Sequence, residues 1–490
     1  MSSRGYRFPR SPSSFFIVAM PPIKAHPLLL PEVSLHVSRF VTLEDAIACA
    51  RVCKDWNDLF TSVVWRTIDC NAPNRTFELD PTAIKKHGHH IRVIKGVWGI
   101  HDLKVLQGSN LCMLQSLSMI LDGTPNIQAY SFDLLRQNIA SLTSVEISVS
   151  VEEMWSTKVF FPIDAISTRC PLKLTHLKIA SLAFTRGGFS SFLRICPALK
   201  VLDIMETNLY SDLSFSEPYQ HTGLVQLHTS PQQMLRPDSD SPNAPSLLVH
   251  FPKLRKLRIW NPSDLSQPSP WMIRDEVAQH CPLLKEVLID APATITATLL
   301  MNAFMALTHI MVDHDALSMD VVMGVLSHKH TLECVGSFAP FRGYYGQDKI
   351  PILVESTGSA PGWAMQLVPQ DCLKLTTIRF PLFEMDMDDI EKVTWSCSHL
   401  EELFIRIRGL DTQERIDRAI ALWIRVRTMK RRRACVGETS DLDQQNDQGE
   451  EIAALTNGTL IEDRVARHFM RFERLQRVWL GHGVRKVRIE

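Results

Sequence analysis

The sequence of 490 residues has no long apolar run, no excess of charge and no closely paired cysteines. No stretch approaches the roughly 18 consecutive apolar residues of a membrane-spanning helix. The 53 Lys and Arg residues equal the 53 Asp and Glu residues, which argues against a surface devoted to nucleic acid or acidic membrane. The 11 cysteines are scattered without a Cys-x-x-Cys pair, a pattern typical of buried thiols in a reducing compartment. We therefore expect a cytoplasmic or nuclear protein that binds neither nucleic acid nor membrane.

The sequence also lacks the common motifs of enzymes and metal sites, such as a Gly-rich phosphate loop, His-Glu-x-x-His or Gly-x-Ser-x-Gly. The histidine cluster His87–His90 has no cysteine or carboxylate at metal-ligand spacing, so a solvated turn is favoured over a metal site. The acidic run Met385–Asp389 is better explained as a helix start than as a metal site, because carboxylates are favourable there. We expect no enzymatic activity, no metal and no cofactor.

The first 27 residues differ in composition from the rest. They contain Arg4, Arg7 and Arg10 with several serines and prolines, and no acidic residue precedes Glu32. This composition favours a disordered tail over a targeting signal, and Met20 remains an alternative start of the chain.

Residues 28–68 predict a compact module of three short helices. Pro31 suits the first turn of a helix, because its missing N–H is unpaired there in any case. Thr42 is the expected N-cap of a second helix, with acidic residues in the first turn. A third helix is expected from about Asp55, with Trp56 on its apolar face. So small a unit buries little surface alone, so we expect it to dock on a partner or on the next domain.

This module resembles the F-box family. Leu30-Pro31-Glu32 is similar to the opening signature of that family, Val52–Trp56 to its Val-Cys-x-x-Trp core, and Trp65 to its closing tryptophan. The resemblance implies docking onto a Skp-family adaptor and, through it, onto the cullin and RING subunits of a ubiquitin ligase. Carried over by position, the adaptor-binding residues would be Leu30, Pro31, Val33, Leu35, Val37, Phe40, Val52, Cys53, Trp56 and Leu59. Alternatively, these apolar residues form the module's own core; for Val52 and Trp56 we expect both roles.

From residue 87 to residue 490 the chain repeats the pattern apolar-x-x-apolar-x-apolar, with neighbouring copies about 23–32 residues apart. Each copy predicts a short strand, and a helix or loop would return the chain to the next one, so that neighbouring units share one core. Triplets such as Leu-Lys-Ile favour strands over an all-helical stack. Clear copies begin at Leu114, Leu142, Leu174, Leu199, Leu254, Leu284, Leu307, Leu375, Leu400 and Leu475, and weaker ones at Ile91 and Leu332.

This region resembles the degenerate leucine-rich repeats that often follow F-boxes. The resemblance implies an α/β fold, namely an irregular horseshoe-like solenoid of parallel strands with helices or loops on the convex side. Regular repeats carry an asparagine three positions after the strand pattern, where this chain has residues such as Ser150, Thr207 and Pro262, so we expect no asparagine ladder. Two gaps of 55 and 75 residues between copies are near two and three periods, and are expected to hold unrecognised or replaced repeats.

Three insertions are expected in the solenoid, at residues 210–248, 338–370 and 434–450. The first predicts a long loop rich in Ser and Pro. The third follows the basic cluster Lys430–Arg433, which is either the cationic end of an amphipathic helix over 412–433 or a nuclear-localisation or phosphate-binding patch. The second has many aromatic residues, which are favoured at binding hot spots. The candidate substrate-binding residues there are Phe341, Tyr344, Tyr345 and Trp363.

Residues and resemblance together predict the substrate-recognition subunit of an SCF (Skp–cullin–F-box) E3 ubiquitin ligase. The repeats would hold an unidentified target protein close to the ubiquitin-transferring enzyme. One alternative is an F-box scaffold or adaptor-sequestering protein outside a ligase. Another is an enzyme or nucleic-acid binder whose site assembles only in the folded chain.

Overall fold

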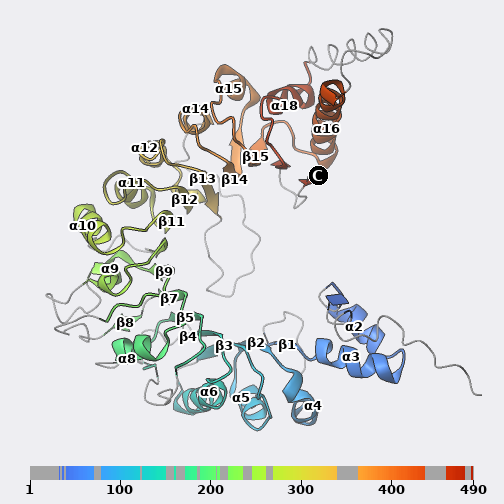
Figure 1. Ribbon diagram of the computed structural model, residues 1–490, viewed down its shortest axis with the longest axis vertical. Coiled ribbons are helices and arrows are strands. Elements are labelled where there is room, and N and C mark those ends of the chain that lie inside the picture. Colours follow the sequence, from blue (N-terminus) through green and yellow to red (C-terminus); the bar gives the residue numbers. More distant parts are fainter. Residues whose placement is uncertain are drawn as a thin grey trace, which may run out of the picture.

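The computed structural model is an arc with one parallel sheet on its inner face and helices on its outer face (Figure 1). A small helical module precedes the sheet at one end of the arc. The expected α/β architecture, a helical N-terminal region followed by a large parallel sheet, is confirmed. The described residues are 33, 36–37, 40–70, 79–121, 124–149, 159–161, 171–184, 188–205, 207–209, 219–235, 246–260, 269–338, 362–435, 459–480 and 487–488.

The helical module contains α2 (Leu43–Ala50) and α3 (Lys54–Val64). Thr42 caps α2 as predicted, since its hydroxyl oxygen accepts from the backbone N–H of Asp45 at 3.2 Å. The sheet begins directly after α3, at β1 (Thr67–Asp69), and therefore earlier than residue 87, where we expected the repeats to begin. The module and the solenoid are thus continuous through backbone pairing.

Among the described residues, the main sheet has fifteen strands in chain order, and every neighbouring pair is parallel except the last. Each predicted copy of the repeat pattern, including the two weaker ones, forms a strand. A separate small sheet pairs β6 (Ala183–Phe184) with β8 (Asn208–Leu209). The other strands are β2 (Val93–Val97), β3 (Ser116–Leu121), β4 (Ser144–Val149), β5 (His176–Ala180), β7 (Val201–Met205), β9 (Gln226–Thr229), β10 (Lys256–Trp260), β11 (Glu286–Asp290), β12 (His309–Asp313), β13 (Cys334–Phe338), β14 (Thr377–Met385), β15 (Glu402–Ile407), β16 (Arg477–Leu480) and β17 (Val487–Arg488).

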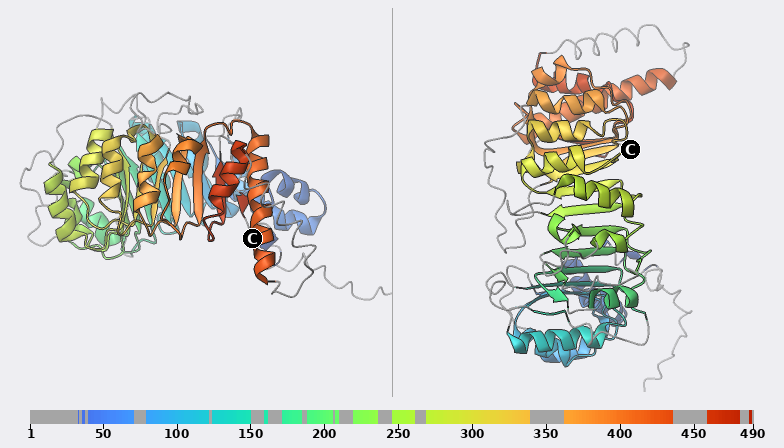
Figure 2. Two further views of the ribbon diagram at one scale, coloured as in Figure 1. Left: turned by 90° about the horizontal axis from the view of Figure 1, so that it is seen from above. Right: turned by 90° about the vertical axis from the view of Figure 1, so that its left-hand side faces the viewer.

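Helices on the outer face cover the buried side of the sheet (Figure 2). Alternate strand residues such as Leu257 and Ile259 are fully buried against them, while Lys256 and Arg258 point to the inner face. The helices are α4 (Pro81–His87), α5 (Ile100–Gln107), α6 (Pro125–Asn138), α8 (Gly188–Ile195), α9 (Pro231–Leu235), α10 (Pro270–His280), α11 (Ala293–Asn302), α12 (Met319–Leu326), α13 (Gly362–Met365), α14 (Leu367–Asp371), α15 (Met387–Lys392), α16 (Gln413–Cys435) and α18 (Ile461–Phe469), with short 3-10 turns η2 (Gly88–His90), η4 (Leu247–His250) and η5 (His314–Ala316).

The expected insertions are partly occupied by repeat elements. Residues 210–248 contain β9 and α9, so the prediction of one long loop is wrong there. The apolar pattern does not predict the repeat copy that forms β9, because its third apolar position is Thr229. This threonine is buried and donates a hydrogen bond to the side chain of Gln233 at 3.2 Å. Residues 338–370 contain α13 and the start of α14, and residues 339–361 and 436–450 lie outside the described part.

Helix α16 fills the longest gap between copies, because β15 pairs directly with β16. The predicted amphipathic helix over 412–433 is confirmed, and Trp423 on its apolar face is buried against Phe469 of α18. Two ties fix the helix to the last repeat: Arg415 Nε donates to Glu462 at 2.8 Å, and Arg427 Nη2 donates to the Glu473 carbonyl at 2.5 Å.

A ladder of backbone hydrogen bonds joins successive turns in place of the missing asparagine ladder. In each rung, one carbonyl accepts two N–H groups of the next turn: Gln115 O accepts from Thr143 (2.8 Å) and Ser144 (3.0 Å). Some threonine hydroxyls add a third bond, as from Thr175 to Thr143 O at 2.9 Å. The rungs are the carbonyls of Arg66, Arg92, Gln115, Thr143, Thr175, Lys200, Val225, Arg255, Lys285, Thr308, Glu333, Thr376 and Glu401.

Cysteine and histidine side chains complete the turns that lead into the strands. Cys196 and Cys281 are buried as expected, and burial raises the pKa of both thiols to about 12, so they remain neutral packing groups. Cys170 lies outside the described residues. His221 bridges two turns, since its Nε2 donates to Cys196 O at 2.8 Å while its Nδ1 accepts from Leu224 N at 3.0 Å. These bonds satisfy backbone groups that the turns would otherwise leave unpaired.

Buried His468 predicts a dependence of stability on pH. Its ring packs edge-on against Trp395 (4.9 Å) and Phe472 (5.5 Å), and burial lowers its pKa to about 3. Below the ordinary value of 6.5 the unfolded chain takes up a proton that the folded chain refuses, so stability falls as pH falls. In His468→Phe we expect the free energy of unfolding to fall less steeply between about pH 7 and pH 5, by up to about 1.4 kcal/mol per pH unit less than in the wild type. The melting temperature measured across this pH range should fall less steeply as well. Exposed His399→Phe is the control, and equal slopes in all three proteins would contradict this account.

Candidate functional site

The helical module displays large apolar side chains at its surface. Phe40 is 77% exposed, Val52 65% and Leu43 57%, whereas Ala46 and Phe60 are buried and form the interior. A small domain with its own buried residues has no internal reason to expose three more apolar side chains. This exposed set, Phe40, Leu43 and Val52, is therefore a candidate surface for a protein partner, and we call it the apolar docking surface.

The other residues that the sequence pointed to divide between partial burial and exposure. Val33, Val37, Trp56 and Leu59 are half-buried, and Cys53 is exposed. Leu30, Pro31 and Leu35 lie outside the described residues.

We expected Trp56 and Val52 to belong to the module's own core as well as to bind the adaptor. The core role holds for Trp56 alone, and the adaptor-binding role of both stays a prediction. The Trp56 ring lies 5.6 Å from Phe60, which suits a residue that is both packed and accessible. Val52 is too exposed to belong to the interior, so its predicted core role is wrong. It lies in the turn between α2 and α3, and its side chain is exposed there. Leu43 was missed, because nothing in the sequence distinguishes this first residue of α2 from a core residue.

Trp65 fixes the module to the first repeat. Its ring stacks on that of His87, with centroids 4.7 Å apart and planes inclined by 12°. Beside it, Arg66 O accepts from Arg92 N (2.9 Å) and Val93 N (3.0 Å) as the first rung of the ladder. His87 is thus a half-buried packing residue, although we expected a solvated turn, and the described residues contain no cluster able to hold a metal ion. The docking surface therefore has a fixed orientation relative to the arc.

The middle of the inner face is lined by charges that neutralise one another between adjacent strands. A lysine–glutamate pair joins β5 to β4, between Lys178 and Glu146. Lys256 Nζ lies 3.6 Å from a Glu286 oxygen on β11, and the Asp203 and His228 side chains approach to 2.8 Å between β7 and β9. The two lysines of this row thus each have a carboxylate on the neighbouring strand, which partly offsets their charge.

Arg258 and Asp290 form a largely buried pair of this row, at 3.8 Å between β10 and β11. Burial raises the pKa of Asp290 and lowers that of Arg258, while each side chain partly offsets the shift of the other. Both effects are typical of an ion pair withdrawn from water.

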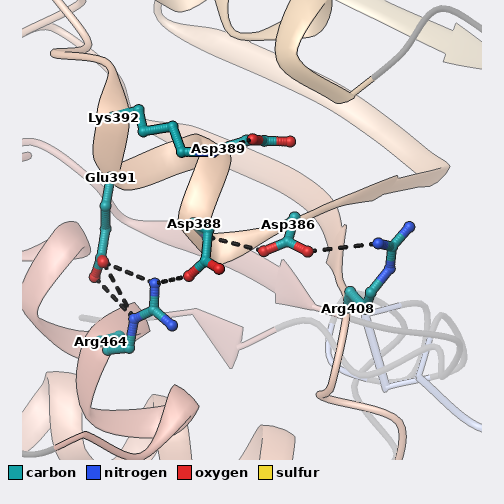
Figure 3. A network of polar contacts seen from close by, with 7 residues as sticks. All are labelled: Asp386, Asp388, Asp389, Glu391, Lys392, Arg408 and Arg464. Carbon is teal, nitrogen blue, oxygen red and sulfur yellow. Dashed lines mark hydrogen bonds and ion pairs between the residues drawn. The ribbon is translucent and has the colours of Figure 1, made fainter.

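The acidic run Met385–Asp389 begins a helix, as predicted. Asp386 caps α15 by accepting from Asp388 N at 2.9 Å. Figure 3 shows the Arg464 guanidinium of α18 between Asp388 and Glu391, with Nη2 at 2.5 and 2.8 Å from their carboxylates. These acidic residues thus join two neighbouring outer helices.

The candidate substrate-binding residues cannot be placed on this frame. Phe341, Tyr344 and Tyr345 lie outside the described residues. The backbone of Trp363 belongs to α13, and its side chain is outside the described part. No helix in the described ranges combines the length and apolar character needed to cross a membrane.

Comparison with known proteins identifies the N-terminal module. Residues 31–71 match the F-box-like family, so this segment is an F-box-like domain and the resemblance found in the sequence is confirmed. No curated protein matches the chain.

Two solved structures are similar in fold at low identity. The crystal structure of the Rad7 and Elc1 complex in yeast has 12% identity and a TM-score of 0.34, covering 78% of this chain and 92% of that chain. The complex of TLR13 with ssRNA13 has 11% identity and a TM-score of 0.31, covering 66% and 46%.

The contact between α15 and α18 predicts a salt-sensitive contribution to stability. The Arg464 guanidinium lowers the pKa of Asp388 below its ordinary value of 3.8, so this contact stabilises the folded chain at pH values above 3.8. Arg464→Gln removes that stabilisation. We expect the melting temperature at neutral pH to fall by about 2 °C at low salt, and by less at about 1 M NaCl. The control is Lys392→Gln, which removes a single exposed pair with Asp389. A loss in Arg464→Gln that is the same at both salt concentrations would contradict the electrostatic explanation.

Proposed function

We propose that this chain is the target-recognition subunit of an SCF-type E3 ubiquitin ligase. The observation that carries the proposal is an F-box-like segment in which the large apolar side chains of Phe40, Leu43 and Val52 are exposed. A Skp-family adaptor is the partner that such a segment implies, with the cullin and RING subunits bound through it. The adaptor would cover Phe40, Val52 and Leu43 together with the half-buried Trp56 and Leu59.

The mechanism in this proposal is proximity rather than bond chemistry. The adaptor side holds the ubiquitin-transferring enzyme, and the arc holds a lysine-bearing target protein. The effective concentration of the target is then set by the geometry that links both sites. Trp65 and the first ladder rung support this role, because they allow little movement between module and arc. A rigid link raises effective concentration more than a flexible one of the same length.

We propose further that the aromatic segment 338–370 contributes to target binding through Phe341, Tyr344, Tyr345 and Trp363. Aromatic side chains are common anchors of protein interfaces. Removing residues 339–361 should lower the labelling of target proteins by a proximity-labelling fusion, with the proteasome inhibited. A truncated chain that still labels every target of the wild type would exclude this role.

The apolar docking surface gives the sharpest test of the proposal. Phe40→Asp/Val52→Asp places two carboxylates on a surface meant for apolar contact, and should weaken adaptor binding at least tenfold, or about 1.4 kcal/mol. Both side chains are exposed, so the melting temperature should stay close to that of the wild type. Met323→Asp, at another exposed apolar residue on α12, is the matched control and should bind normally.

Leu30→Ala/Pro31→Ala should likewise abolish binding of the adaptor. If this variant and Phe40→Asp/Val52→Asp both fold and bind the adaptor with unchanged affinity, the proposed adaptor-binding site is wrong. The same purification separates the two roles left open. Cullin recovered together with the adaptor supports a ligase subunit, whereas adaptor without cullin supports a scaffold or sequestering protein, whose F-box would be engaged in the same way.

A further inference from the structure

The last three parallel strands of the inner face carry two aromatic side chains among several arginines. Arg379 of β14, Phe404 of β15 and Trp479 of β16 lie side by side in register. The two rings have centroids 6.4 Å apart and planes inclined by 34°, and the Arg379 guanidinium lies 5.5 Å from the Phe404 ring. Both rings are half-buried, so one face of the sheet offers an apolar area bordered by a cation.

Positive charge exceeds negative charge around these rings. Arg379 and Arg477 both pair with a single carboxylate, that of Glu402, which lies between them on β15. The Glu402 side chain is only 6% exposed, whereas those of Arg379 and Arg477 are 45% and 49% exposed. Arg406 adds a third guanidinium two residues beyond Phe404 on the same face of β15. We call Arg379, Phe404, Arg406, Arg477 and Trp479 the aromatic–arginine platform.

The shared glutamate prepares the platform for an anionic ligand. One carboxylate cannot use all the donors of two guanidinium groups, each of which has five N–H bonds in a rigid fork. Glu402 therefore holds Arg379 and Arg477 in place from below and leaves donors facing outward. Glu384 of β14 limits the excess charge, since it lies opposite Arg406 in register, but it is also engaged by Arg408 at 3.4 Å. In the middle of the arc, by contrast, Lys178, Lys256 and Arg258 each pair with a carboxylate on the neighbouring strand.

We propose that the aromatic–arginine platform binds an acidic peptide segment that carries an aromatic or aliphatic side chain. The apolar side chain would pack on Phe404 and Trp479, and flanking carboxylates would bond to Arg379, Arg406 and Arg477. Arginine and tryptophan are also the residue types that contribute most to interface energies. The inference deepens the proposed function, since it gives the chemical class of the target, but the binding itself needs no adaptor.

The position of the platform fits a target-holding role. It lies on the last strands of the arc, and Figure 1 shows these strands and helices α2 and α3 on the two sides of one opening. A segment bound there would extend into the space that faces the F-box-like domain. This arrangement brings the target toward the partner that the domain is proposed to hold.

The test is fluorescence anisotropy with the full chain and no adaptor. The probe is a fluorescein-labelled peptide of six Glu and Asp residues around a central Phe, compared with a central Ser and with Lys at the acidic positions. The chain should bind the acidic Phe peptide best, and more weakly as salt rises from about 50 to about 300 mM. Arg406→Gln should weaken binding about tenfold, and Trp479→Leu should remove the preference for Phe over Ser.

Controls keep the test decisive. Arg136→Gln removes an exposed arginine on α6, on the outer face, that pairs with Asp133. This variant should bind the peptide like the wild type. Arg406→Gln leaves the Glu402 pairs intact, so it is informative even where Arg477→Gln lowers the melting temperature. Equal binding of the Lys peptide, no response to Arg406→Gln, or displacement of the peptide by a tighter-binding single-stranded oligonucleotide would each overturn the proposal. None of these outcomes depends on adaptor binding, so this inference can fail while the proposed function stands.

Discussion

The backbone ladder at the start of each strand is the constraint on which the rest of the structure depends. Thirteen carbonyls, from Arg66 to Glu401, each accept two N–H groups from the following turn. These bonds start each strand beside the previous one, so that the buried positions of neighbouring strands line up against the outer helices, apart from register shifts in the β2–β3 and β14–β15 pairs. Because both donor and acceptor belong to the backbone, the ladder requires no particular side chain. Regular repeats achieve the same link with a buried asparagine, and this chain shows that the link survives without it.

The two proposed binding surfaces lie at opposite ends of this ladder. Its first rung is Arg66, the residue after Trp65, which anchors the F-box-like domain. Its last rung is Glu401, the residue before Glu402, which organises the arginines of the platform. The relation between the domain and the platform is therefore set by the accumulated geometry of all intervening turns.

The sequence was sufficient to locate most strands, because their inward residues alternate and the pattern recurs at a nearly constant interval. It failed at β9, where a threonine fills an apolar position and finds a hydrogen-bond partner. The F-box-like segment was also recognisable from residues close together in the chain. Ion pairs such as Arg379–Glu402 and the Phe404–Trp479 contact were not predictable, because they join residues whose neighbourhood exists only after the strands take their register. The exposure of Val52 and Leu43 depends on the packing angle of two helices, which spacing alone does not determine.

The freedom of inner-face side chains from the ladder has a further consequence, for evolution. Substitutions at these positions alter what the arc can recognise while the bonds between turns stay the same. A chain of this design can acquire a new target by changing a few inner-face residues on two or three strands, such as β14 to β16. The constant part of this design is a pattern of backbone amides and carbonyls, which places no demand on the side chains of the inner face.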